Sequence, residues 1–332
     1  MNKTRICVLG KQSEQLDEGM TNIAYHISKN LEESFPNLKL FNVENAFSVG
    51  FWKKILHYKP DIVHYIPGPT TKGLVLLKII QLITKSKTVV SATRPVLPKY
   101  FKLFSNFLKP DLVFVQSSKS KNFFKNINYK TVFLSNGVDT ERFTPTDTAT
   151  KKVLRKKYGF NEDDFIVLHI GPIKKARNQR ALISIPNIKI LLIVSLTNKS
   201  EPEEYNELKK ENVVIWKSYF PNIEEIYGIV DLYVFPGIED LNSIEIPLSV
   251  LEAMSCNLPV VTTRYGGLES IFEEGDGLFF VNSSNELEKV IMSIKNNSLV
   301  IKTREKALNY SWKNIVTKLT QFYHELIPEI KN

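Results

Sequence analysis

Cysteine is scarce in this sequence, which has two cysteines among 332 residues. Cys7 and Cys256 lie far apart in the chain, so they form no disulfide framework and are typical of a reducing compartment. The sequence has no HxxxH motif, no DxD motif and no Cys/His cluster of metal-binding character. We therefore expect neither a metal site nor a bound cofactor.

Long apolar runs are also missing. The nearest approach to one is residues 73–84, which Lys78 and Gln81 interrupt. That stretch is shorter than the roughly 18 residues of a membrane-spanning helix. The polar residues Met1–Arg5 lead into an apolar stretch too short for a secretory signal. The sequence therefore predicts a cytoplasmic protein.

Negative charge is under-represented in the first half. Residues 1–150 carry 21 Lys and Arg against 11 Asp and Glu, whereas the remainder carries 23 against 24. The excess favours either a solvated surface or a half that faces anionic lipid or a phosphate-bearing substrate. The lysines are scattered, and zinc-finger and RNA-recognition signatures are absent, so no nucleic-acid partner is expected. An anionic membrane surface is a candidate partner, with peripheral attachment at the inner face of the membrane.

Short β-branched runs alternate with helical patterns along the whole chain. Several runs are continuously apolar, which is typical of strands buried on both faces of a parallel sheet. Repeated βα units predict an α/β protein with doubly wound sheets. The predicted strands are Arg5–Leu9, Asp61–Tyr65, Thr88–Ala92, Leu112–Gln116, Thr131–Leu134, Phe165–Ile170, Ile190–Val194, Val213–Trp216, Leu232–Phe235 and Pro259–Thr262.

A polar stretch near the middle of the sequence predicts a linker between two domains. Thr146–Thr150 consists mainly of small polar residues and follows the segment Asn136–Asp139. The length of the chain is sufficient for two domains. The predicted organisation is an N-terminal domain over residues 1–145, a C-terminal domain over 146–310 and a closing helical region over 311–332.

The most informative stretch runs from Ser243 to Met254. Pro247 suits the first turn of a helix, because its missing N–H removes no hydrogen bond there. Leu248 and Ser249 then belong to the positive end of that helix, which favours an anion such as a phosphate. Glu252 lies one turn further on, where a carboxylate accepts hydrogen bonds from sugar hydroxyls. The stretch therefore predicts a sugar-nucleotide site.

Several motifs together resemble the GT-B-fold retaining glycosyltransferases of family 4, also described as glycosyl transferases group 1. The motifs are Leu134–Asp139 with Phe143 and Pro145, Asp231–Pro236, Pro247–Met254, Leu258–Gly267, Trp312 and the pair Phe322–Tyr323. The resemblance implies two Rossmann-like domains facing across a cleft, with the last helix crossing back to the first domain. It also implies a nucleotide-diphosphate sugar as the donor substrate.

The resemblance assigns Glu252 to the donor ribose, against the alternative of a solvated helix carboxylate. The family usually has a second glutamate eight residues earlier, where this chain has Ile244. The neighbouring Glu245 is the predicted substitute and a candidate catalytic residue, and Glu239 and Asp240 are also near.

The loop Gly171–Asn178 resembles the family loop that holds the donor diphosphate. Pro172 replaces the family's first cation, and Arg177 stands where the second is expected. Arg177 clamps phosphate oxygens bidentately, and Lys174 or Lys175 is predicted to supply further charge. A basic surface loop is the alternative. The donor base is predicted to contact Tyr219, for which ordinary packing is an equal alternative.

In the first half, Gly19 resembles the family glycine that lets backbone approach the donor, although a simple turn explains it equally well. His64 ends a strand and is a candidate catalytic or acceptor-side residue, with a structural histidine as the commoner outcome. Arg94 is predicted to bind an anionic acceptor. An apolar and basic pattern over Leu97–Leu108 predicts a helix that either packs on its own sheet or lies in a membrane surface.

The resemblance thus predicts a metal-independent, retaining hexosyltransferase-like enzyme of glycan biosynthesis, with no enzymic nucleophile. It would move a sugar from a nucleotide-diphosphate donor to a glycan or a lipid-linked acceptor. The alternatives are a sugar-nucleotide epimerase or hydrolase of the same fold, and a catalytically degenerate binding subunit.

Overall fold

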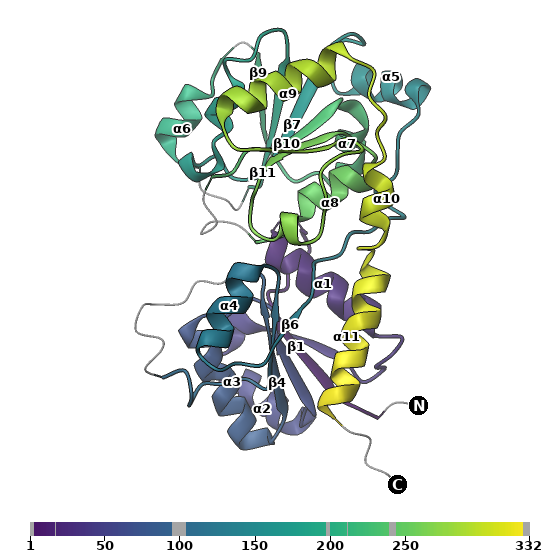
Figure 1. Ribbon diagram of the computed structural model, residues 1–332. Coiled ribbons are helices and arrows are strands. Elements are labelled where there is room, and N and C mark those ends of the chain that lie inside the picture. The colour runs from purple at the N-terminus through teal and green to yellow at the C-terminus, as the bar shows by residue number, and fades with distance from the viewer. Residues whose placement is uncertain are drawn as a thin grey trace. The chain divides into compact units, whose positions relative to one another are not determined.

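The computed structural model describes residues 3–16, 18–94, 104–196, 200–210, 212–238 and 244–327. The chain divides into two compact units (Figure 1). Unit 1 comprises Met1–Gly137, Ser243–Ile246 and Trp312–Asn332, and unit 2 comprises Val138–Asn242 and Pro247–Ser311. The first boundary therefore falls at Gly137, before the polar stretch predicted as the linker. The short segment Ser243–Ile246 groups with unit 1, which the sequence did not indicate.

Unit 1 contains a six-stranded parallel sheet in the order β2-β1-β3-β4-β5-β6. Its strands are β1 (Ile6–Gly10), β2 (Lys39–Asn42), β3 (Ile62–Tyr65), β4 (Lys87–Ala92), β5 (Leu112–Val115) and β6 (Thr131–Phe133). Every residue of β1, β3 and β5 is buried. This explains their continuously apolar sequences, because helices cover both faces of such a sheet.

Two groups of helices cover the sheet of unit 1 (Figure 1). On one face, α2 (Val49–Tyr58), α3 (Thr71–Thr84) and α4 (Ser118–Asn126) share a core with alternate strand residues. On the other face, α1 (Gly19–Leu31) packs beside α11 (Trp312–Leu326), and Phe322 and Tyr323 of α11 contact strand residues Phe114 and His64. The 3-10 turn η1 (Val43–Asn45) follows β2.

Side-chain caps start three of the helices of unit 1. Ser48, Thr70 and Ser117 each accept a hydrogen bond from the backbone N–H three residues on, at the starts of α2, α3 and α4 respectively. Such caps satisfy an N–H group that has no partner within the helix, and each contributes about 1 kcal/mol.

Unit 2 contains a second six-stranded parallel sheet, in the order β12-β11-β10-β7-β8-β9. Its strands are β7 (Ile166–Ile170), β8 (Lys189–Val194), β9 (Val213–Lys217), β10 (Leu232–Phe235), β11 (Val260–Thr263) and β12 (Leu278–Val281). The predicted α/β fold with two doubly wound sheets is confirmed.

The helices of unit 2 also lie on both faces of their sheet (Figure 1). One face packs against α9 (Ser284–Asn296) and the turn η4 (Gln179–Leu182). The remaining elements are α5 (Thr148–Lys157), η3 (Lys175–Arg177), α6 (Pro202–Glu207), α7 (Ile223–Ile229), α8 (Leu248–Ser255), η6 (Leu268–Ser270) and α10 (Thr303–Leu308). Of these, α8 contacts β10, β11 and α10, and α5 contacts α7.

Three further expectations concern the predicted helix Leu97–Leu108, membrane-spanning helices and metal sites. Most of the predicted helix Leu97–Leu108 lies outside the described residues; its end, from Phe104, forms turns closed by a hydrogen bond from Leu108 N to Phe104 O (3.1 Å). Within the described ranges, no helix combines the length and the apolar character needed to cross a bilayer. In the same ranges, no three His, Cys, Asp or Glu side chains gather in a way that suits a metal ion.

Gly137, the last residue of unit 1 before the first boundary, lies against the start of α11. A Cβ atom at Gly137 would lie 2.6 Å from Trp312 Cδ2 and 2.9 Å from Trp312 Cα. The Trp312 ring is itself fixed, since it stacks on His26 of α1 with ring centroids 5.2 Å apart. This position therefore has no room for a side chain.

We expect Gly137→Ala to lower the free energy of unfolding by about 1–3 kcal/mol, because the methyl group collides with the backbone of α11 as well as with a side chain. Urea unfolding measures the change. Gly50→Ala is the matched control, since Gly50 is an exposed residue of α2 with open space around its Cβ position. Helix propensity predicts a neutral or stabilising effect there. Equal stability of the two variants would contradict the prediction.

Candidate functional site

The carboxyl ends of β7 and β10 and the start of α8 gather polar side chains in unit 2. Gly171 follows β7 directly, and the loop after it leads to Arg177 on η3. Ser249 and Glu252 lie in the first turns of α8. Ligands of doubly wound sheets bind at this edge, where the strands end and helices begin.

Arg177 is a buried cation held in one orientation. Its side chain is 7% exposed, and its guanidinium lies over the Phe235 ring at 5.1 Å from the ring centroid. Burial lowers the pKa of Arg177, and the nearby Tyr265 and Tyr233 oppose that effect. An arginine keeps its charge under such a shift, so the site holds a desolvated positive charge.

The loop that carries Arg177 is fixed by hydrogen bonds at several points. Gln179 Nε2 donates to Pro172 O (2.9 Å), Glu201 N donates to Ile173 O (2.9 Å), and Ile238 N donates to Ala176 O (3.0 Å). Gly171 has a φ of 154°, and a Cβ atom there would lie 3.7 Å from Arg177 Cζ and 3.2 Å from His169 Nε2. The missing side chain of Gly171 thus leaves space in front of Arg177 and His169.

His169 supplies a buried neutral imidazole in the same cluster. Its Nδ1 lies 2.9 Å from Val234 O, and because a carbonyl only accepts, Nδ1 carries the proton. Burial and the charge of Arg177 lower the pKa of His169 to about 3, so the ring is neutral at ordinary pH. Nε2 is therefore a hydrogen-bond acceptor, and it has no partner among the described residues.

Two tyrosines orient the polar residues of α8. Tyr233 of β10 donates its hydroxyl hydrogen to Ser249 Oγ (2.6 Å), and Tyr227 of α7 donates to Glu252 Oε2 (2.7 Å). Glu252 is half-buried, and burial raises its pKa while Tyr227 and Arg142 oppose the increase. The carboxylate of Glu252 thus keeps Oε1 for further hydrogen bonds to a ligand.

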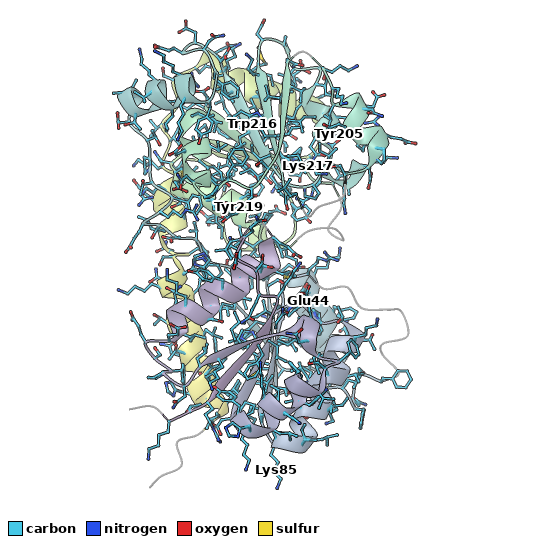
Figure 2. All side chains as sticks on the ribbon, turned by 180° about the vertical axis from the view of Figure 1, so that it is seen from behind. Glu44, Lys85, Tyr205, Trp216, Lys217 and Tyr219 are labelled. Atoms are coloured by element: carbon cyan, nitrogen blue, oxygen red, sulfur yellow. The ribbon has the colours of Figure 1, made fainter. Side chains whose placement is uncertain are left out.

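The remaining residues predicted for the donor side also lie in unit 2. Leu248 is buried as the first residue of α8, Lys174 directly precedes η3, and the exposed Lys175 is the first residue of η3. Tyr219 is partly exposed and follows the carboxyl end of β9, two residues after Lys217 (Figure 2). No contact recorded for the side chains of Lys174 and Tyr219 assigns them a role, so both stay predictions.

Glu245 belongs to unit 1, and hydrogen bonds within that unit hold it. Its Oε1 accepts hydrogen bonds from Ser117 Oγ (2.7 Å) and Ser120 Oγ (2.5 Å), and its N–H donates to Thr93 O (2.8 Å). The side chain is 4% exposed. Its carboxylate thus lies at the N-terminus of α4, where a negative charge is stabilised. Glu245 therefore anchors residues 244–246, which does not support the predicted role in sugar binding, and that role stays a prediction.

A further hydrogen bond holds the same segment. Asn136 Nδ2 donates to Ile246 O (2.7 Å), and Asn136 Oδ1 accepts from Gln116 Nε2 (2.7 Å). The neighbouring Ile244 packs towards Gly19, since a Cβ atom at Gly19 would lie 3.2 Å from Ile244 Cδ1. Gly19 is the first residue of α1, and the predicted approach of its backbone to the donor stays a prediction. Glu239 and Asp240 lie outside the described residues.

His64 is a structural residue of the unit 1 sheet. It is fully buried, with Nδ1 2.6 Å from the Tyr323 hydroxyl and Nε2 2.7 Å from the Ser91 hydroxyl. Both ring nitrogens are therefore occupied within the unit, which does not support the predicted catalytic or acceptor-side role. Arg94 is exposed just beyond β4, so its predicted contact with an anionic acceptor stays a prediction.

Sequence reasoning missed His169, Tyr227 and Tyr233. His169 had a usable signal, because it stands two residues before the loop glycine at the end of a predicted strand. The tyrosines had none, since each pairs with an α8 residue through the tertiary structure.

The two buried histidines predict a loss of stability in mild acid. Burial lowers the pKa of His64 and of His169 to about 3, whereas an unfolded histidine has a pKa of about 6.5. Below about pH 6.5 the unfolded chain therefore binds more protons. We expect the free energy of unfolding to fall with decreasing pH, by about 1.4 kcal/mol per pH unit for each histidine.

Urea unfolding between pH 7 and pH 5 measures this slope. We expect His64→Gln and His169→Gln each to make the slope shallower, whatever their effect on stability at pH 7. His57→Gln, at an exposed position of α2, should leave the slope as it is. Unchanged slopes in both buried variants would show that these histidines do not govern the acid response.

The anchoring role and the sugar-binding role of Glu245 make different predictions. If Glu245 is an anchor, Glu245→Gln and Ser120→Ala should each lower the free energy of unfolding by about 1–2 kcal/mol. Both variants should then leave the thermal shift caused by nucleotide sugars unchanged. Glu44→Gln is the control, since Glu44 is exposed (Figure 2). A smaller ligand-induced shift in Glu245→Gln, with Ser120→Ala behaving as wild type, would restore the role in sugar binding.

We compared the chain with known protein families and with individual proteins. Residues 150–313, which include the cluster around Arg177 and α8, match the family model described as Glycosyl transferases group 1. The putative glycosyltransferase EpsD of Bacillus subtilis is 27% identical over 154 residues, which cover 44% of this chain and 39% of that protein. The UDP-Gal:alpha-D-GlcNAc-diphosphoundecaprenol alpha-1,3-galactosyltransferase of Escherichia coli is 27% identical over 209 residues, covering 58% of this chain and 50% of that protein. The chain thus spans half or less of the length of these two relatives.

Among solved structures, HepE of Anabaena in complex with UDP and glucose superposes with a TM-score of 0.75 and 18% identity. The superposition covers 97% of this chain and 100% of that chain. At this identity the likeness concerns the fold, and it extends over both units. Residues 150–313 therefore belong to the glycosyl transferases group 1, and the chain as a whole has the two-domain GT-B fold.

Proposed function

We propose that the protein transfers a sugar from a nucleotide-diphosphate donor to an acceptor hydroxyl. The observation that carries this proposal is the buried guanidinium of Arg177, fixed beside Gly171 in the unit that also holds Ser249 and Glu252 at the start of α8. A preorganised cation stabilises the charge that develops on a leaving diphosphate. Family membership and a neighbouring fold solved with UDP and glucose support the same donor class.

The donor would lie with its diphosphate on Arg177 and on the first N–H groups of α8, which are free of partners within the helix and carry a partial positive charge. Glu252 would accept hydrogen bonds from ribose hydroxyls through Oε1, while Tyr227 holds its Oε2. Lys174 and Lys175 add positive charge on the same loop. These cations and amides would stabilise the negative charge of the diphosphate, as a divalent ion does in other enzymes. We therefore propose metal-independent transfer.

We infer retention of configuration from the family resemblance. The acceptor oxygen would form a bond to the anomeric carbon on the face from which the bond to the phosphate oxygen breaks. The departing phosphate oxygen takes the acceptor proton, so no enzymic nucleophile is needed. Water would compete with the acceptor at this carbon, and a closed site would favour transfer over hydrolysis.

The acceptor is proposed to be a glycan or a lipid-linked sugar. The name of the E. coli relative describes transfer to a diphosphoundecaprenol-linked sugar, which supports this class. A donor-binding module without transfer is the second candidate, and the placement of Glu245 in unit 1 favours it, because the usual pair of glutamates is then incomplete.

We expect Arg177→Ala to lower the rate of transfer by about 100-fold or more, because the charge on the leaving diphosphate loses its main protein partner. The assay follows release of the nucleoside diphosphate with an acceptor present. Arg180→Ala is the matched control, since Arg180 is exposed nearby and pairs with Glu204 (2.8 Å). Equal rates of transfer in both variants would show that Arg177 does not stabilise the leaving diphosphate.

Glu252→Gln should weaken donor binding with little change in stability, since Tyr227 can still donate to the amide oxygen. The donor-induced thermal shift measures this effect across a panel of nucleotide sugars. A shift in wild type without any acceptor-dependent product would favour the binding module. The anomeric configuration of the product, read by NMR, tests retention.

A further inference from the structure

The solvent face of α3 in unit 1 is apolar. Val75, Ile79, Leu82 and Ile83 are exposed by 41%, 43%, 63% and 45%, respectively. The first three follow one another at intervals of four and three residues, so they form one stripe along the helix. The opposite face is already buried in the core through Leu74, Leu77 and Ile80. A surface helix normally has a polar outer face, so this stripe is an unusual feature.

An aromatic side chain from another part of unit 1 lies beside the stripe. Phe107 is 64% exposed, and Lys78 Nζ of α3 lies 5.4 Å from the centroid of its ring. We call Val75, Ile79, Leu82, Ile83 and Phe107 the α3 patch. Contiguous exposed apolar patches of this kind mark an interaction site.

The sequence around the α3 patch carries charge of one sign. Between Asp61 and Asp111 the chain has no Asp or Glu and has eight Lys and Arg. Lys72 and Lys85 lie at the two ends of α3, and Lys85 projects from the surface (Figure 2).

Both flanking acids are paired with cations. Asp61 pairs with Arg5 (3.1 Å), and Asp111 pairs with Lys87 (3.1 Å) and accepts a hydrogen bond from Gln81 of α3 (3.1 Å), so seven of the eight cations remain as excess positive charge. The rim of the patch therefore complements a negative surface.

The aliphatic stripe and the cationic rim together favour one of three possible binding partners. A second copy of this chain, joined through the same patch, would bring two sets of lysines together. Nucleic acid would meet mainly aliphatic side chains, which do not stack on bases as aromatic ones do. An anionic lipid bilayer accepts both features, because the acyl region takes the apolar stripe and the headgroups pair with the lysines.

We propose that the α3 patch docks on an anionic membrane surface, with α3 lying in the plane of the interface. The patch would bring a lipid-linked acceptor to the enzyme, and in that respect the inference rests on the proposed function. The lipid contact itself depends on the patch and its charge.

Vesicle flotation tests the proposal with the full chain and two compositions, phosphatidylcholine alone and phosphatidylcholine with phosphatidylglycerol. We expect binding to the anionic vesicles that weakens as salt is raised. Ile79→Ser with Leu82→Ser should lower the partition coefficient about tenfold or more. Lys72→Gln with Lys85→Gln should lower it roughly fivefold per lysine. The matched control is Val153→Ser with Val300→Ser, two exposed apolar positions of unit 2, which should bind as wild type.

Three outcomes would overturn the inference. They are equal binding to both vesicle types, equal binding by wild type and the Ile79/Leu82 variant, and a dimer in light scattering that this variant abolishes. Thermal melts verify that the variants fold. If the Ile79/Leu82 variant does not fold, the Lys72/Lys85 variant still tests the proposal. The nucleotide-sugar thermal shift without vesicles separates the two proposals, since it reports the donor site of unit 2 and not the α3 patch.

Discussion

Both units depend on one constraint, the parallel pairing of all the strands in each sheet. Parallel pairing brings the carboxyl ends of the strands to one edge, and the loops there collect the polar residues that the buried strands exclude. In unit 2 this edge holds Gly171, Arg177 and the start of α8. In unit 1 the corresponding loops, after β4, β5 and β6, hold Thr93, Ser117 and Asn136, and all three bind residues 244–246. The same geometry thus makes a candidate ligand site in one unit and an anchoring site in the other.

The burial of Arg177 makes its charge sensitive to its surroundings. The guanidinium loses hydration, and contact with the Phe235 ring offsets part of that loss. An anion beside the guanidinium would be attracted more strongly than at the surface, because the effective dielectric of a buried site is low. The hydrogen bonds from Gln179 and Ile238 matter for the same reason, because they hold the loop in place before any ligand arrives.

How far the sequence predicts this protein depends on whether a residue's role is local. Every predicted strand is present, whereas β2 and β12, which are edge strands, were missed. The residues Lys39–Asn42 of β2 are only partly buried, so their pattern carried little signal. Arg177, Ser249 and Glu252 could be proposed from the sequence because loop and helix-start motifs are contiguous. The contacts of Glu245 could not be predicted, because its partners Ser117 and Ser120 lie 128 and 125 residues away. The contact of His64 with Tyr323 is also remote in sequence, since Tyr323 belongs to the last helix.

The anchored segment also explains how the chain can tolerate an isoleucine where the family has a glutamate. Ile244 lies against Gly19. The neighbouring carboxylate of Glu245 is stabilised by hydrogen bonds from two serine hydroxyls and by the N-terminus of α4. A glutamate at position 244 would face that aliphatic contact, and Glu245 has already taken the available donors. Residues 244–246 directly precede α8 in the sequence, and their hydrogen bonds to Thr93, Ser117 and Asn136 hold them within unit 1. The segment that carries Ile244 and Glu245 is thus held by contacts within unit 1, whereas Arg177, His169 and Glu252 belong to unit 2.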